Sequence, residues 1–368
     1  MNPIAHNTME VTSTEVTSTK AAAFRRAVMG WYAPEVRNMP WAGETDPYKV
    51  WLSEVILQQT QVEQGRPYYE VFVERFPSVG ELASATEDEV LRLWQGLGYY
   101  SRARNLHKTA RIVAGTRDGM FPSTYDELLM LPGIGPYTAA AIASLSRNLP
   151  HAVVDGNVIR ALARYFGIDR SVSTAGGKRI IESLAERLLD RTLPGRYNQA
   201  LMNFGALQCR PRNPDCASCP LKRSCRARGT GRVEDLPIRN RPLPKTHRWF
   251  NYLVVWVKGS FLIRKRIGDD IWKGLYEFPL IETAREVTVR HLSRRPELKA
   301  LVPSPVSPAN LPIIRLKQTL SHRVVHARFI EIGLNKAPKG FLKVKPENMH
   351  RFAFPRVINW YLEESHLP

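Results

Sequence analysis

Two carboxyl groups far apart in the chain lie in settings that could make them an acid and an anion in one reaction. Glu54 lies inside an apolar helical run, VWLSEVIL, where loss of water raises the pKa of a carboxyl group and keeps it protonated near neutrality. Asp155 precedes the helical stretch GNVIRALAR, whose dipole favours the ionised form. Two plainer interpretations stay open: Glu54 on the polar side of an amphipathic helix, and Asp155 as a structural aspartate.

The segment before Asp155 has the pattern of a phosphate-binding turn. Residues 131–135, LPGIG, place two glycines around one apolar residue, and a helix follows at Pro136. Such a turn can point backbone N–H groups outward, and the helix adds its positive end. The pattern predicts a phosphate contact at Gly133 and Gly135; a buried helical turn is the alternative.

All four cysteines lie within 209–225, in the spacing C-x6-C-x2-C-x5-C. This clustering indicates a ligated metal centre rather than a disulfide scaffold. Four thiolates suit structural zinc or a [4Fe–4S] cluster equally well, so the spacing leaves the metal open. Basic residues fill the gaps and would hold positive charge against phosphates, although a purely structural staple is compatible with the same residues. The four candidate ligands are Cys209, Cys216, Cys219 and Cys225.

Two further stretches carry groups suited to an opened base pair. The amides and hydroxyl of residues 58–61, QQTQ, could replace lost base-pair hydrogen bonds, or face solvent. The turn GLGYY at 96–100 places two tyrosines beside arginines, and aromatic groups near cations can wedge into a base stack. Ordinary helix packing is the alternative for this turn.

The composition indicates a polyanionic partner. The chain has 368 residues, with 53 Lys and Arg against 34 Asp and Glu, a formal net charge of +19. Nucleic acid is the first candidate and a membrane surface the second, although no apolar run is long enough to span a bilayer. Residues 1–20 lack an apolar signal core and are predicted to be a disordered tail, which leaves a cytoplasmic, nucleoid-associated location.

These residues require two domains to position them. Residues 21–228 show helical spacing without convincing strand alternation, and include the cysteine loop. Residues 229–247, rich in Pro and basic residues, predict a linker. Residues 248–368 predict a small α+β domain, with a strand hairpin near its start, a second strand pair around Ser321 and a final helix.

The ordered motifs resemble the adenine DNA glycosylases of the MutY type, in the helix-hairpin-helix glycosylase superfamily. The resemblance covers nearly everything after residue 30. It implies a multi-domain fold: an all-α helix-hairpin-helix glycosylase domain whose cysteine loop holds a [4Fe–4S] cluster, and a Nudix-like domain that helps to recognise 8-oxoguanine. The matching motifs are PYKVWLSEVILQQTQV (47–62), GLGYYSRARNLH (96–107), LPGIGPYTAAAI (131–142), VDGNVIRALAR (154–164) and the cysteine loop.

The resemblance also implies roles for single residues. Glu54 matches the general acid that protonates adenine, and Asp155 matches the carboxylate that stabilises the oxocarbenium-like sugar. Tyr137 and Asn157 match residues that position these two carboxyls. Acid-assisted cleavage of a glycosidic bond agrees with the reading of the two carboxyls given above. The implied DNA contacts are Arg37, Gln59, Thr60, Leu97, Tyr99, Gly133, Gly135, Ser321 and His322.

Position 137 indicates the reaction mode. Related glycosylase/lyases carry a lysine there, whose amine attacks the sugar, whereas Tyr137 cannot form a Schiff base. We therefore expect a monomeric, monofunctional enzyme that removes adenine opposite 8-oxoguanine or guanine in double-stranded DNA and leaves an abasic site. Lys49 and Lys178 are the nearest other amines in sequence, and the sequence places neither in a pocket.

Two departures from the family pattern bear on the second domain. The recognition loop reads Leu320-Ser321-His322 where the family commonly has Phe-Ser-His, so an aromatic contact is missing. In the best placement of the Nudix signature, Val289 and Arg290 replace the metal-binding Glu pair. Pyrophosphate hydrolysis needs those carboxylates for Mg²⁺, so we expect a domain that reads a base rather than a hydrolase.

Three other functions fit parts of the chain less well. A glycosylase/lyase of the endonuclease III type, acting on damaged pyrimidines, would need an amine at position 137. A non-catalytic DNA-binding protein would not need both Glu54 and Asp155. A Nudix nucleotide hydrolase would need carboxylates at positions 289 and 290, which are Val and Arg.

Overall fold

A computed structural model describes residues 17–33, 39–240, 243–301 and 313–365 of the chain. These residues divide into two compact units. The first comprises residues up to Glu81 and Lys108–Arg241, and the second comprises Leu82–His107 and the residues from Pro242 onwards. No helix in the described ranges is both long and apolar enough to cross a membrane.

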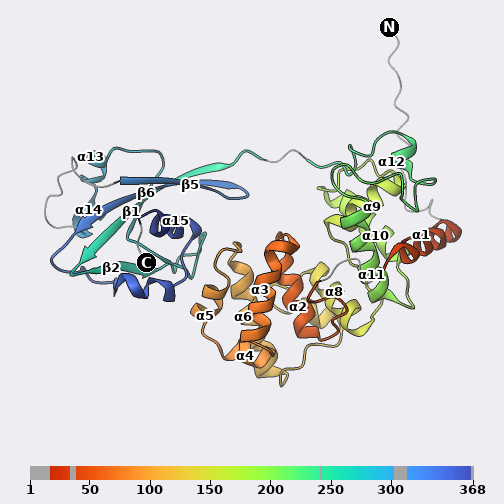
Figure 1. Ribbon diagram of the computed structural model, residues 1–368, viewed down its shortest axis with the longest axis horizontal. Helices are drawn as coiled ribbons and strands as arrows, with labels where there is room; N and C mark the ends of the chain where they lie inside the picture. The colour runs from red at the N-terminus through yellow and green to blue at the C-terminus, as the bar shows by residue number, and fades with distance from the viewer. Residues whose placement is uncertain (1–16, 34–38, 241–242, 302–312, 366–368) are drawn as a thin grey trace, which may run out of the picture. The chain divides into compact units, whose positions relative to one another are not determined.

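The first unit is helical (Figure 1), and its helices begin at the caps that the sequence supplies. Asp46 accepts a hydrogen bond from the backbone of Tyr48 to start α2, and Thr174 caps α10 in the same way. Its helices are α1 (Ser18–Trp31), α2 (Pro47–Leu57), α3 (Val62–Arg75), α4 (Val79–Ser84, which crosses into the second unit), α7 (Tyr125–Leu129), α8 (Pro136–Arg147), α9 (Gly156–Phe166), α10 (Ala175–Leu188), α11 (Pro194–Asn203), the π-helix η3 (Phe204–Gln208) and α12 (Arg226–Gly229).

Helix α9 lies at the centre of this unit, because nearly all of its side chains are buried. Leu162 and Phe166 pack in one apolar cluster with Phe24 of α1, Leu184 of α10 and Leu201 of α11. The same packing holds the N-terminal end of α9 against η3. This fixes the position of Asp155, the residue that precedes α9.

The second unit contains a seven-stranded sheet with the order β3-β2-β1-β6-β5, in which β4 pairs with β1 and β7 with β2. Strands β1 and β6 run parallel, and β5 and β6 form an antiparallel hairpin. The strands are β1 (Thr246–Val257), β2 (Ser260–Lys265), β3 (Tyr276–Glu277), β4 (Leu280–Thr283), β5 (Ile313–Thr319), β6 (Arg323–Gly333) and β7 (Leu342–Val344).

Helices cover both faces of this sheet. Tyr361 of α15 (Arg356–Glu364) stacks on Phe329 of β6 with ring centroids 4.3 Å apart, and α15 crosses the sheet in Figure 1. On the other face, Leu292 of α13 (Val289–Leu292) and Leu298 of α14 (Pro296–Leu301) pack against Leu253. The unit also contains α5 (Glu87–Leu93), the first part of α6 (Ser101–Thr116), up to His107, and the 3₁₀ helix η5 (Pro346–Arg351).

Two boundaries differ from those expected. Residues 82–107 group with the sheet: Asp88 accepts hydrogen bonds from Lys265 and Tyr276, and Arg104 donates to the Lys273 carbonyl. Helix α1 begins at Ser18 because Thr17 caps it, so the expected tail at 1–20 is too long; residues 1–16 lie outside the described ranges.

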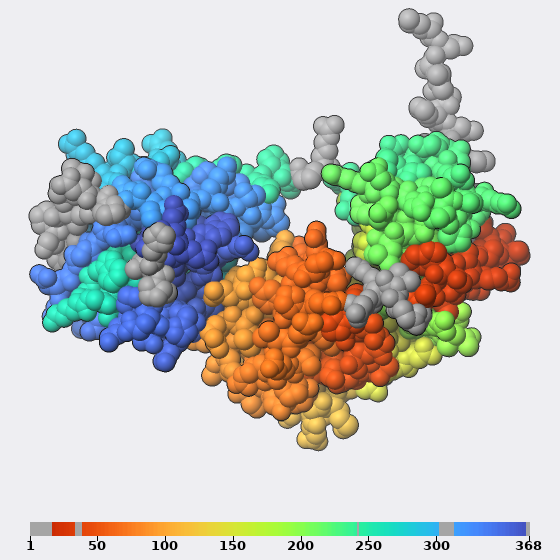
Figure 2. All heavy atoms as spheres, viewed as in Figure 1, coloured from red at the N-terminus to blue at the C-terminus, as the bar shows by residue number. Residues whose placement is uncertain are grey.

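The expected linker at 229–247 is also wrong over most of its length. Residues 229–240 lie on the helical unit, where they continue its surface (Figure 2). Leu236 is 2% exposed and its carbonyl accepts from Arg164, while Ile238 accepts from the backbone of Val172. Thr246 already belongs to β1. A buried leucine and several hydrogen bonds thus attach to the helical unit a segment whose composition predicts a linker.

Candidate active site

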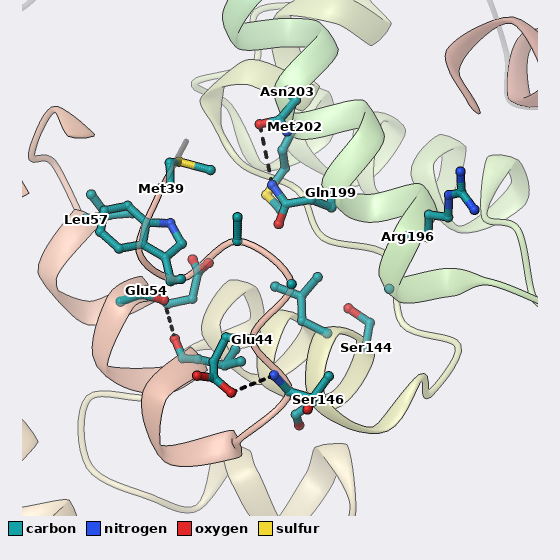
Figure 3. Close-up of a pocket in the computed structure, with 18 of the residues that line it drawn as sticks. Met39, Glu44, Glu54, Leu57, Ser144, Ser146, Arg196, Gln199, Met202 and Asn203 are labelled. Carbon is teal, nitrogen blue, oxygen red and sulfur yellow. Dashed lines mark hydrogen bonds between the residues drawn. The ribbon is translucent and has the colours of Figure 1, made fainter. Parts of the chain in front are cut away.

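Four predicted catalytic side chains line one pocket of the helical unit. Glu54 comes from α2, Tyr137 from α8, and Asp155 and Asn157 from the start of α9. Figure 3 shows Glu54 facing the pocket from one wall, with α11 on the opposite side. The four residues lie in three separate stretches of the sequence, and the fold brings them together.

Glu54 is 7% exposed and sits among the buried side chains of α2. The Tyr137 hydroxyl donates a hydrogen bond to Glu54 Oε2. Burial raises the pKa of Glu54 to about 7; the Tyr137 hydrogen bond opposes this rise, and the charge of Asp155 adds to it. Glu54 therefore holds a proton up to neutral pH, as its apolar flanks predict.

Asp155 caps α9 and accepts three hydrogen bonds. They come from the backbone of Val158 at 2.7 Å, the backbone of Asn157 at 2.9 Å and the Asn157 side-chain amide at 2.6 Å. Burial nonetheless raises the pKa of Asp155 above its ordinary value, although these bonds and Arg160 act in the opposite direction. The expected shift towards the ionised form is thus wrong in its net direction, because desolvation outweighs the helix end.

A buried arginine connects this carboxylate to the cysteine loop. Arg160 donates to Asn157 Oδ1 at 2.9 Å and to the Cys209 carbonyl at 2.7 Å. Since Oδ1 of Asn157 is occupied, its amide nitrogen points at Asp155. Gly205 of η3 makes this approach possible: a Cβ there would meet the Asn157 carbonyl oxygen at 2.4 Å. The sequence singled out neither Arg160 nor Gly205.

Sequence reasoning also missed two amides on α11. Gln199 and Asn203 line the pocket, and Gln199 Nε2 donates to Asn203 Oδ1 at 3.4 Å (Figure 3). Their spacing of four residues places them on one helix face. That spacing was the signal available, but nothing in the sequence linked this helix to Glu54.

The predicted phosphate-binding turn borders a second pocket that shares three predicted catalytic residues with the first. Gly133, with φ +78°, and Gly135, the N-cap of α8, line it together with Glu54, Tyr137 and Asp155.

The sequence placed neither alternative lysine in a pocket, and the structure differs for one of the two. Lys178 lines the second pocket, contrary to expectation, and forms an ion pair with Glu182 at 3.6 Å. Lys49 pairs with Glu44 at 3.5 Å.

The remaining predicted DNA contacts are placed individually. Gln59 and Tyr99 both adopt left-handed backbone conformations, with φ of 58° and 47°, which are uncommon for side-chain-bearing residues. Tyr99 is 41% exposed, whereas Leu97 is buried. Thr60 lines the first pocket. Arg37 lies outside the described residues.

Ser321 and His322 form the exposed turn between β5 and β6. Ser321 Oγ lies 2.9 Å from His322 Nδ1, and the Leu320 backbone donates to the Arg323 carbonyl to close the turn. The start of β1 supports this turn, since Thr246 N donates to the His322 carbonyl and Lys245 Nζ to that of Leu320. A hydroxyl and an imidazole are thus presented at the tip of a hairpin.

The four cysteines line one small pocket against Tyr165, Phe204 and Leu221. Arg164 donates to the Cys209 carbonyl and lies 3.5 Å from its Sγ atom. Burial raises the pKa of Cys219 to about 11, so this thiol needs a bound cation to ionise. Among the described residues no three His, Cys, Asp or Glu side chains are grouped closely enough to hold one metal ion.

This combination of a helical turn, a buried acid and a capped aspartate defines a class of DNA-repair protein. Residues 52–188 match the family model of the HhH-GPD superfamily base excision DNA repair proteins, and residues 251–364 match the NUDIX domain. A solved thermostable thymine-DNA glycosylase is 27% identical and aligns with a TM-score of 0.53, over 58% of this chain and 98% of that one.

Curated relatives give the family. The adenine DNA glycosylase of Buchnera aphidicola is 35% identical over 321 residues, which cover 85% of this chain and 87% of that protein. The human adenine DNA glycosylase is 42% identical over 226 residues, or 59% of this chain and 41% of that protein. The chain belongs to the adenine DNA glycosylase family. Its chemistry is accordingly the hydrolysis of an N-glycosidic bond in DNA.

Proposed function

We propose that the chain is a monofunctional base-excision repair enzyme that removes adenine opposite 8-oxoguanine or guanine in double-stranded DNA. The observation that carries this proposal is the pairing in one pocket of a protonated Glu54 with Asp155. The basic charge of +19 suits a DNA partner. A monomeric state and a nucleoid location are part of the same proposal.

In the proposed reaction the adenine leaves the base stack and enters the pocket. Glu54 gives its proton to the adenine ring, so the base departs as a neutral molecule with the electrons of the C1′–N bond. Asp155 faces the positive charge that develops on the sugar and stabilises it. A water molecule then adds to C1′ and loses its proton to a carboxylate, which leaves an abasic site.

Three neighbouring side chains position these groups. Tyr137 orients Glu54 through its hydroxyl, and Asn157 orients Asp155 through its amide. The amide of Gln199 is placed to donate to and accept from a purine edge, since it lines the same pocket on the facing helix.

The lesion is recognised outside this pocket in our proposal. Gln59 and Tyr99 fill the gap that the base leaves, supported by their unusual backbone conformations at solvent-accessible turns. Thr60 and Ser321 contact the orphan base, and Gly133 and Gly135 contact the backbone phosphate. His322, hydrogen-bonded to Ser321, holds that hydroxyl in place.

The Nudix-like domain serves as a reader. The Glu277 carboxylate of β3, which takes the first glutamate position of the Nudix signature, is 2% exposed and forms ion pairs with Arg264 and Arg266. Arg290 occupies one position of the missing Glu pair, in the single turn of α13. A carboxylate paired with two arginines supports the absence of pyrophosphate hydrolysis.

A single-turnover assay tests the reaction mode. Duplexes with adenine opposite 8-oxoguanine, adenine opposite guanine, and a damaged pyrimidine are incubated with the enzyme and read with and without alkali. We expect adenine release from the first two, with strand breaks only after alkali, because Tyr137 offers no amine. Strand cleavage without alkali would contradict the monofunctional mechanism and point to Lys178. Asp155→Asn, which keeps the duplex contacts, is the inactive control.

We also propose that the four cysteines hold a [4Fe–4S] cluster. The donor set fits: four thiols line the pocket, with cationic Arg164 to offset thiolate charge. The Asp215 carboxylate in the same lining accepts hydrogen bonds from the backbone and hydroxyl of Ser218. Such a cluster would fix the loop 209–225, whose Cys209 carbonyl anchors Arg160. The role is therefore structural support of the Asp155 side of the pocket.

Metal analysis distinguishes the cluster from zinc. Anaerobically purified protein should contain iron and sulfide with visible absorbance, and Cys219→Ser should lose both and lower the unfolding temperature. Ser218→Ala, beside it, is the control and should keep the iron. Stoichiometric zinc without iron in native protein would refute this assignment.

A further inference from the structure

One face of the sheet in the second unit carries a cluster that the proposed function does not use. His247 and Trp249 of β1 lie beside His326 of β6, on neighbouring parallel strands (Figure 1). The Trp249 and His326 rings stack at 4.9 Å and 10°, and the two imidazole rings lie 5.1 Å apart. We call these three residues the ring cluster.

Basic side chains extend this cluster across the sheet. Lys317 of β5 stands opposite His326, and Arg315 stands opposite Arg328 in the next row. Arg315 and Lys317 are exposed, and Arg315 lies 3.9 Å from a carboxylate oxygen of Glu286. Arg328 is 7% exposed and donates to the neutral Asn251 Oδ1 at 3.0 Å. The face therefore combines cations with aromatic N–H donors.

The ring cluster is continuous with the turn that carries Ser321. Thr246, next to His247, donates to the His322 carbonyl, and the first pairs of β1 and β6 start directly behind the turn. A duplex whose orphan base reaches Ser321 would bring its backbone to this face. Phosphate oxygens accept from imidazole and indole N–H groups and are attracted to Lys and Arg.

We propose that the ring cluster, with Lys317 and Arg315, binds the sugar–phosphate backbone of the duplex beside the orphan base. This rests on the proposed function, because the position of the duplex follows from the Ser321 contact. The occupant is DNA rather than another polyanion because the face adjoins the base-reading turn.

The two histidines of the ring cluster make the proposed phosphate contact depend on pH, because the pair can take up a proton. His247 Nδ1 and His326 Nε2 lie 2.9 Å apart, so one nitrogen donates and the other accepts. With that bond kept, the pair is neutral or carries one charge, and the charged form turns the remaining ring nitrogens into donors. Burial lowers the pKa of His326, as do His247 and Lys317, while Glu286 opposes them. Phosphate binding therefore favours uptake of one proton as pH falls.

Equilibrium binding to a fluorescent duplex with adenine opposite 8-oxoguanine tests this proposal. The full chain carries Asp155→Asn throughout, so the duplex stays intact. We expect Lys317→Ala to weaken binding several-fold and to lower the salt dependence by about 0.9 in log–log slope, the value of one phosphate contact. Lys343→Ala, an exposed cation on β7, is the matched control and should leave the slope unchanged.

The histidines are tested by pH. The reference protein should bind more tightly at pH 6 than at pH 8, by up to about tenfold per pH unit for one proton. His326→Gln should lose most of this gain. The proposal is overturned if Lys317→Ala and His326→Gln bind like the reference, or if Lys343→Ala weakens binding as much. Adenine release, measured separately with Asp155 intact, tests the proposed function independently of these outcomes.

Discussion

Adenine release should fall about tenfold for each pH unit above about pH 7. In the proposed mechanism Glu54 acts in its protonated form. Burial raises its pKa to about 7, so the active fraction declines as the pH rises through that value. Single-turnover rates on duplex with adenine opposite 8-oxoguanine, measured from pH 5 to 9, would show this decline as the alkaline limb of the pH–rate profile.

Two variants assign the limb to Glu54. Glu54→Gln should lose about 10²–10⁴-fold in rate and show no limb, because an amide gives no proton. Tyr137→Phe should move the limb to higher pH, since the Tyr137 hydrogen bond lowers the pKa of Glu54. Glu63→Gln, on the exposed start of α3, is the matched control. A limb that stays in place in Tyr137→Phe would show that another group titrates.

Loss of Arg160 should disable the site by releasing the side chain that holds Asp155. Its guanidinium serves Asn157 Oδ1 and the carbonyls of Gly156, Gly205 and Cys209, at 2.9, 3.3, 2.5 and 2.7 Å. Arg160→Gln leaves buried acceptors without donors, each at about 1–3 kcal/mol, and releases the Asn157 amide that holds Asp155. We expect adenine release to fall at least about 10²-fold and the unfolding temperature to drop.

Two comparisons separate positioning from simple loss of stability. Asn157→Ala should reduce the rate without loss of iron. It removes the side-chain contact to Asp155 and one acceptor of Arg160, but it leaves the bond from Arg160 to the Cys209 carbonyl in place. Arg179→Gln, on the exposed side of α10, should resemble the unaltered protein. If folded Arg160→Gln releases adenine at the unaltered rate per active molecule, the positioning role is wrong.

The sequence predicted the local environment of each carboxyl group, but it did not predict that Glu54 and Asp155 lie in the same pocket. The apolar flanks of Glu54 predict its burial, and the helix after Asp155 predicts its capping position. Tyr137 and Glu54 stand 83 residues apart, and only a family resemblance could join them before the fold was known.

What the sequence missed depended on packing between distant elements. Gln199 and Asn203 of α11 line the pocket, and Gly205 of η3 lies against Asn157, only because of how distant helices pack. A local sequence pattern does not indicate which helix packs opposite another. The net pKa direction of Asp155 was missed for a related reason: the helix end is visible in sequence, whereas the depth of burial is not.

The grouping of residues 82–107 with the sheet also determines when this segment can pack during translation. Asp88 leaves the ribosome 188 residues before Tyr276, its hydrogen-bond partner. At about 5–20 residues per second, this segment waits roughly 10–40 s for that partner. During this interval Leu91, which packs near Gly274 in the finished protein, has no native cover from the sheet. The apolar surface around Leu91 thus lacks its contacts with the sheet until the last third of the chain has been synthesised.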